Sequence, residues 1–193
     1  MSIVDEISLE IIESLRRNDG LRRKHASFWN FHKKSSKELG LFSERFHKFE
    51  SDYRSNIIGW ALCEKDPPDV FANLADGRKI GIEITELVNE AAIDAQIRKP
   101  DEYSEELFQF GFDEASEEIR RIVREKEEKL FPAMSDYDEL ALLIHTDEFL
   151  LKSDQFAPGV AAYILDNSRV FESVYLLFSY EPDKQQCPLV KLK

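Results

Sequence analysis

The chain has 193 residues, of which 42% are hydrophobic and 33% are charged. This length predicts a single domain, and the hydrophobic content suffices for a packed core, which excludes a disordered chain or a collagen-like fibre. Lysine and arginine number 26 against 38 aspartates and glutamates, which gives a net charge of −12. Such a charge argues against a general nucleic-acid-binding protein, because contacts with phosphates require cations.

Cysteine usage and the N-terminus indicate the compartment. Cys63 and Cys187 are too few for a disulfide scaffold, and they do not have the spacing of a zinc site. The first residues lack the basic and apolar regions of a secretory signal, and no apolar stretch approaches the ~18 residues that a membrane span needs. We therefore expect a cytoplasmic protein with no membrane contact.

The charge is distributed unevenly along the chain. Residues 16–37 contain eight basic residues and one acid, a net of +7, whereas residues 101–148 carry sixteen acids and five bases, a net of −11. We expect the basic segment to bind a nucleic-acid backbone, with Trp29 and Phe31 available to stack on bases. A solvated helical face explains the same pattern, and both readings stay open. The residues expected to contact nucleic acid are Arg22, Arg23, Lys24, Lys33 and Lys34.

Helical periodicity dominates the first third of the chain. Apolar residues recur at helical spacing from Ile3 to Leu15, and Gly20 is a stop signal. A second stripe, in which aromatic residues predominate, predicts a long helix from about Ser43 to Cys63, ending before a Pro-Pro pair. We expect residues 1–40 to form a helical, basic extension and residues 41–193 to form an α/β domain.

Strand patterns begin after the Pro-Pro pair. Residues 70–74 and the alternating residues 80–85 predict two strands, and Asp76-Gly77 between them is a hairpin turn signal. The polar stretch 89–111 is expected to be a loop or a weak helix, and Asp113 to Leu130 a strong amphipathic helix that Pro132 closes.

The last part of the chain predicts further strands. The apolar runs 140–144 and 174–178 are typical of buried strands, and Leu189-Val190 of an edge strand. Residues 156–166 are expected to be helical. The predicted fold is one α/β domain with a central mixed sheet flanked by helices.

Two carboxylates of the predicted hairpin stand out. Asp69 opens one strand, and Glu83 follows fourteen residues later in the partner strand, on the face opposite Ile82 and Ile84. Two close carboxylates repel each other and are costly to desolvate unless a cation joins them. Hard oxygen ligands of this kind suit Mg²⁺ or Mn²⁺.

Around these residues the sequence resembles the PD-(D/E)xK nuclease superfamily, which has a restriction-endonuclease-like fold. The matching residues are Pro68-Asp69 and Glu83-Ile84-Thr85, in a predicted order of helix, hairpin, helix and strand. The resemblance implies a metal-dependent phosphodiesterase acting on DNA or RNA. It also implies that Asp69, Glu83 and the carbonyl of Ile84 hold Mg²⁺ or Mn²⁺.

The sequence departs from the family pattern where Thr85 replaces the expected lysine, which orients the attacking water and stabilises charge. Lys126 continues the apolar stripe of the 113–130 helix, so it is the preferred substitute. Lys79 shares the parity of Glu83 but lies about 13 Å away along the strand, which makes it a poorer candidate. The family often adds a glutamate from the preceding helix, and Glu50 is the preferred residue for that role.

Three functions remain open at this point. The first is a nuclease in which the two carboxylates hold the metal and Lys126 or Thr85 orients the water. The second is a nuclease-fold module that binds nucleic acid or a protein without cleavage, which the missing lysine at position 85 favours. The third is an acidic interaction protein, such as an immunity or regulatory protein, whose acidic second half covers a basic partner.

Overall fold

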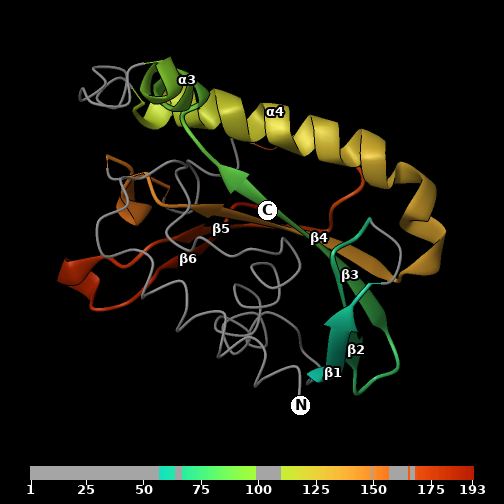
Figure 1. Ribbon diagram of the computed structural model, residues 1–193. Helices are drawn as coiled ribbons and strands as arrows, with labels where there is room; N and C mark the ends of the chain where they lie inside the picture. Colours follow the sequence, from blue (N-terminus) through green and yellow to red (C-terminus); the bar gives the residue numbers. More distant parts are fainter. Residues whose placement is uncertain (1–56, 64–66, 99–109, 149, 157–164, 166–167) are drawn as a thin grey trace, which may run out of the picture.

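The computed structural model describes residues 57–63, 67–98, 110–148, 150–156, 165 and 168–193 (Figure 1). The described residues form an α/β structure with a six-stranded mixed sheet and two α-helices. The order of the strands across the sheet follows their order in the chain. The predicted N-terminal helix, the basic segment 16–37, Glu50 and most of the predicted 156–166 helix lie outside the described residues.

The first three strands form an antiparallel meander. Strand β1 (Ile57–Leu62) pairs with β2 (Val70–Leu74), which pairs with β3 (Lys79–Leu87). The turn between β2 and β3 contains Gly77, whose φ of 90° is readily adopted only by glycine. The hairpin predicted from Asp76-Gly77 is therefore confirmed.

Strand β1 corrects the predicted helix over residues 43–63, because its described end is extended. Ile57 and Trp60 fit helical spacing, but the segment is rich in β-branched and aromatic residues, which also favour strands. Hydrogen bonding along β2 decides between the two, and the register runs from Ile57 opposite Leu74 to Leu62 opposite Val70. Long-range pairing thus overrides the local pattern in this segment.

Helices follow β3 and lead into the parallel part of the sheet. Helix α3 (Glu90–Arg98) falls within the stretch expected to be a loop or weak helix, and α4 (Phe112–Leu130) confirms the predicted strong helix. A 3₁₀ helix (Phe131–Asp136) with Pro132 in its first turn takes over where α4 ends. Helix α4 lies across one face of the sheet, with α3 beside its N-terminal end (Figure 1).

The remaining strands complete the sheet. Strand β4 (Glu139–Thr146) pairs parallel to β3, and β5 (Ser173–Phe178) pairs parallel to β4. Strand β6 (Leu189–Lys191) pairs antiparallel to β5 at the sheet edge, as predicted. Short 3₁₀ helices at Ser153–Phe156 and Pro182–Lys184 lie in the connections.

The two faces of the sheet carry separate hydrophobic clusters. On one face, Ile119 and Ile122 of α4 pack over Leu142 of β4 and Leu176 of β5. The other face includes Ile82, Ile84 and their neighbours on β2, β4 and β5. Strand β3 is an inner strand whose residues 80–84 are buried, so a polar side chain among them is removed from water.

Candidate functional site

The side chain of Glu83 lies on the α4 face of β3 and has no exposed surface. The alternation of a strand explains the placement, because Ile82 and Ile84 belong to the opposite cluster. This confirms the orientation predicted from the sequence. A carboxylate in such a place must be compensated by a cation or by hydrogen bonds.

Lys126 of α4 provides that compensation. Its Nζ lies 2.6 Å from Oε1 of Glu83, and its side chain is 20% exposed. Lys126 reaches the sheet because it continues the face of α4 that buries Ile119, Ile122 and Val123. The structure therefore brings together Glu83 and the lysine that the sequence favoured as a substitute at the site.

Asp69 lies beside Glu83 at the start of the neighbouring strand. Val70 pairs with Ile82, so one step further along the antiparallel register places Asp69 opposite Glu83. Oδ2 of Asp69 accepts a 2.7 Å hydrogen bond from the backbone N–H of Ile84, and Asp69 is 6% exposed. The two carboxylates predicted from the hairpin are thus neighbours in the fold.

The pKa of Glu83 records this environment. Burial, the largest influence, raises the pKa above its ordinary value, and the negative charge of Asp69 raises it further. The hydrogen bond and charge of Lys126 oppose the rise, with a smaller contribution from Lys129. The carboxyl of Glu83 therefore has two charged neighbours, Lys126 and Asp69, which shift its pKa in opposite directions.

The donor set is compatible with a divalent cation. Oε2 of Glu83 is buried with no hydrogen-bond partner among the described residues. Because the N–H and C=O of one strand residue point the same way, the carbonyl of Ile84 is directed to the side on which Asp69 lies. Two carboxylates and a carbonyl are hard oxygen ligands, and Mg²⁺ commonly completes its shell with water. The described residues contain no group of three or more His, Cys, Asp or Glu side chains that could hold a metal ion.

Two other predicted positions take different places. Thr85 lies on β3, half-buried, with the same strand parity as Glu83 and two residues further along. Nζ of Lys79 lies over the rings of Phe71 and Tyr137, at 4.9 and 4.7 Å from their centroids. The ammonium group of Lys79 thus lies against two aromatic rings.

Lys129 is a residue that sequence reasoning missed. Its Nζ lies 3.8 Å from Oε1 of Glu83, and its side chain is 43% exposed. The signal was available, because Lys126 and Lys129 are three residues apart and so share a face of α4. Two lysines therefore approach one buried carboxylate.

Cys63 lies near the carboxylates, but its environment disfavours a nucleophilic role. Burial is the largest influence and raises the pKa of its thiol, and the charges of Asp69 and Glu83 act in the same direction. A hydrogen-bonding contact of 3.5 Å joins its Sγ to the hydroxyl of Tyr137. A thiol with a raised pKa is a poor nucleophile, because the thiolate is the reactive form.

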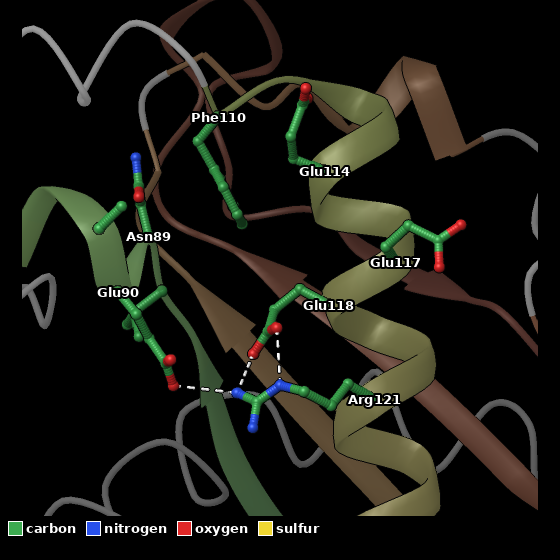
Figure 2. A pocket seen from close by; sticks show the side chains of 9 residues that line it. Asn89, Glu90, Phe110, Glu114, Glu117, Glu118 and Arg121 are labelled. Carbon is green, nitrogen blue, oxygen red and sulfur yellow. Dashed lines mark hydrogen bonds and ion pairs between the residues drawn. The ribbon is translucent and has the colours of Figure 1, made fainter.

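A separate cleft of about 550 Å³ lies where α3 meets α4 (Figure 2). Phe110 and Asn89 line it together with several glutamates. The guanidinium of Arg121 lies between Glu90 and Glu118, at 2.9 Å from Glu90 and in direct contact with Glu118. The predicted site residues are not among those that line this cleft.

None of the helices in the described ranges is long and apolar enough to cross a membrane. Comparisons of the chain with models of protein families, with curated proteins and with solved structures find no match.

Proposed function

We propose that the protein is a metal-dependent phosphodiesterase that cleaves DNA or RNA, with a restriction-endonuclease-like arrangement around the β2–β3 hairpin. The observation that supports it best is the convergence of Asp69, Glu83 and Lys126, which come from the residue before β2, from β3 and from α4. The resemblance implies the order helix, hairpin, helix and strand. The described residues contain the hairpin, helix α4 and parallel strand β4, whereas strand β1 stands where the end of the first helix was expected. The inner position of β3 gives the carboxylates a fixed, desolvated setting.

In this proposal each residue has a distinct task. Asp69, Glu83 and the carbonyl of Ile84 would hold Mg²⁺ or Mn²⁺, and such a metal would supply a water of lowered pKa and stabilise charge on the phosphate. The hydrogen bond from Ile84 N–H holds the carboxylate of Asp69 in place. Lys126 opposes the rise in the pKa of Glu83 and supplies the positive charge that Thr85 lacks.

The contact between Lys126 and Glu83 leaves one oxygen of the carboxylate for a metal. Its ammonium group covers Oε1 of a carboxylate that has no exposed surface. The oxygen Oε2 is the atom of Glu83 that remains for a metal. The flexible four-carbon side chain of Lys126 keeps its positive charge beside this carboxylate.

The ion pair between Lys126 and Glu83 also favours a second candidate function. This candidate is a nuclease-fold module that binds nucleic acid or a protein partner without cleaving it. In that case Lys126 neutralises Glu83 permanently, and the pair serves only the fold. The two candidates differ in one measurable property, which is metal-dependent cleavage.

The test compares wild type with Asp69→Asn and Glu83→Gln on supercoiled plasmid, single-stranded DNA and RNA, each with Mg²⁺ and with Mn²⁺. We expect wild type to nick at least one substrate and both variants to lose at least about a hundredfold in rate, because each removes a proposed metal ligand. Asp94→Asn is the matched control, since Asp94 is an exposed acid on α3. A wild type that binds an oligonucleotide but cleaves no substrate with either metal would establish the binding module instead.

A further inference from the structure

The cleft between α3 and α4 has the size and the lining of a small-molecule site. Its volume of about 550 Å³ lies within the ~300–1,000 Å³ that is usual for ligand pockets. Val88, Ala91 and Phe110 supply apolar surface, and Phe110 lies between Asn89 and α4 (Figure 2). Phe110 is 9% exposed and belongs to the hydrophobic cluster under α4. A ligand in this cleft therefore meets apolar side chains.

Glutamates of both helices form the rim of the cleft. Glu114 precedes Glu117 and Glu118 by three and four residues, so the three side chains share one face of α4. Glu90 of α3 lies across the cleft from them (Figure 2). The rim is therefore acidic on both sides.

The arginines at the cleft do not balance this acidity. Arg121 is the one cation among the described residues that line the cleft. Three carboxylates contact its guanidinium group, those of Glu90, Glu118 and Glu125. Arg120, which is not among the lining residues, is paired with Glu117. When the ion-pair partners are included, five glutamates face two arginines, and a net charge of −3 remains.

Three of the glutamates retain an oxygen for a ligand. Glu114 accepts a 3.0 Å hydrogen bond from Gly111 N–H through Oε2. Glu90 and Glu117 each contact an arginine through Oε1. In the part of the chain that the structure describes, each of the three thus uses one carboxylate oxygen, and the other can accept a hydrogen bond from a cation.

These features select an organic cation rather than a metal ion. The described residues contain no group of three or more His, Cys, Asp or Glu side chains that could hold a metal. A hydrated metal ion also gains nothing from apolar side chains, whereas a methylene chain does. Arg121 shows how a cationic group is held here, because its guanidinium lies between Glu90 and Glu118 (Figure 2).

We propose that the cleft between α3 and α4 binds a linear aliphatic polyamine. Its ammonium groups contact Glu90, Glu114 and Glu117 through charge-assisted hydrogen bonds, and its methylene groups cover Ala91 and Phe110. The alternation of cationic groups and short methylene spacers matches an apolar surface with an acidic rim. This site does not depend on the function proposed for the Asp69–Glu83 cluster.

Calorimetric titration of the full chain with spermidine tests the rim. A salt concentration of about 0.15 M screens attraction to distant charges. We expect saturable binding by wild type and a loss of about threefold to tenfold in affinity for Glu114→Gln/Glu117→Gln, because exposed ion pairs are individually weak. The matched control is Asp94→Asn/Glu128→Gln, which removes the same charge from exposed acids that do not line the cleft. The control should bind as wild type does.

Ala91→Phe tests the apolar part of the cleft without a change of charge. Ala91 is an exposed residue of α3 that lines the cleft, so the added ring should fill the space that the methylene groups need. We expect this variant to lose saturable binding. Thermal unfolding should show that it is as stable as wild type, so that the loss reports on the cleft and not on the fold.

The outcomes decide for or against the polyamine. Equal affinities of the rim variant and its control would show attraction to the overall charge and overturn the proposal. A wild type that does not bind spermidine would overturn it too, as would unchanged binding by Ala91→Phe. A capped peptide of three lysines carries the same charge as spermidine and represents a basic protein. Tighter binding of this peptide, lost in the rim variant, would make the cleft a docking site for a protein instead. Since none of these measurements involves cleavage, the nuclease test stands or fails separately.

Discussion

At the scale of single residues, Glu83 and Lys126 are the most informative pair in the molecule. The strand pattern around Glu83 is that of a core position, yet the residue is an acid. Burial on an inner strand is tolerated because Lys126 contacts it from α4 at 2.6 Å. An arrangement that is costly for stability and brings charges together is typical of a site with a function.

Removal of the Lys126 side-chain charge alone should destabilise the fold. Lys126→Met leaves Glu83 buried without its hydrogen-bonded cation, and we expect a loss of about 2–4 kcal/mol in the free energy of unfolding. The double variant Glu83→Met/Lys126→Met removes both charges and should recover much of that loss, because a buried pair replaced by apolar residues is often neutral. Urea unfolding monitored by circular dichroism measures both. Glu128→Gln, an exposed change on α4, is the control, and a single variant as stable as this control would contradict the prediction.

At the scale of elements, the start of β2 is fixed to β3 by close packing as well as by hydrogen bonds. A Cβ on Gly81 of β3 would lie 2.7 Å from Leu140 Cδ2 and 2.9 Å from Pro68 Cγ. Pro68 immediately precedes Asp69 in the chain. The absence of a side chain at Gly81 therefore lets Pro68 and Asp69 lie against β3.

Gly81→Ala tests this packing. We expect a loss of about 1–3 kcal/mol in stability, because an overpacked position forces its neighbours to move. Displacement of Pro68 should also lower the cleavage rate, since Asp69 moves with it. Gly59→Ala on β1 is the matched control, as its added Cβ meets nothing within 4 Å. Thermal unfolding and the plasmid assay give the two readouts, and equal behaviour of the two variants would refute the account.

At the scale of the whole molecule, acidity sets how stability responds to pH. The chain has 38 acidic side chains, so many carboxyls titrate together in acid. Glu181, which follows β5, is 7% exposed and accepts hydrogen bonds from the N–H and hydroxyl of Ser153, at 2.8 and 3.1 Å. Burial alone would raise the pKa of Glu181, but these hydrogen bonds and Lys184 outweigh it and lower the pKa.

The lowered pKa of Glu181 determines whether its contribution to stability rises or falls with pH. The unfolded state takes up the proton of Glu181 at a higher pH than the folded state does. The stabilisation is therefore complete above the ordinary pKa and is lost as the pH falls through the folded value. We expect Glu181→Gln to cost about 1–3 kcal/mol at pH 7. Urea unfolding from pH 7 downward should show wild type and variant converging below about pH 4.5, whereas a constant difference would count against this role.

Much of the element order follows from local pattern. Period-two alternation predicted β3, continuous apolar runs predicted β4 and β5, and a helical stripe predicted α4. Strand β1 was mistaken for the end of a helix, because Ile57 and Trp60 satisfy helical spacing and only pairing with β2 makes the segment extended. The spacing of residues within a segment does not show which distant strand the segment pairs with.

The candidate site likewise has features that the sequence predicts and features that depend on tertiary packing. The sequence by itself determined that Asp69 and Glu83 belong to one hairpin and that Lys126 shares the apolar face of its helix, because both follow from periodicity. Only the tertiary structure decided that β3 is an inner strand, which buries Glu83 completely, and that the docked helix α4 places both Lys126 and Lys129 on its carboxylate. Those facts depend on how α4 crosses the sheet, and that crossing is set by packing between elements distant in the chain.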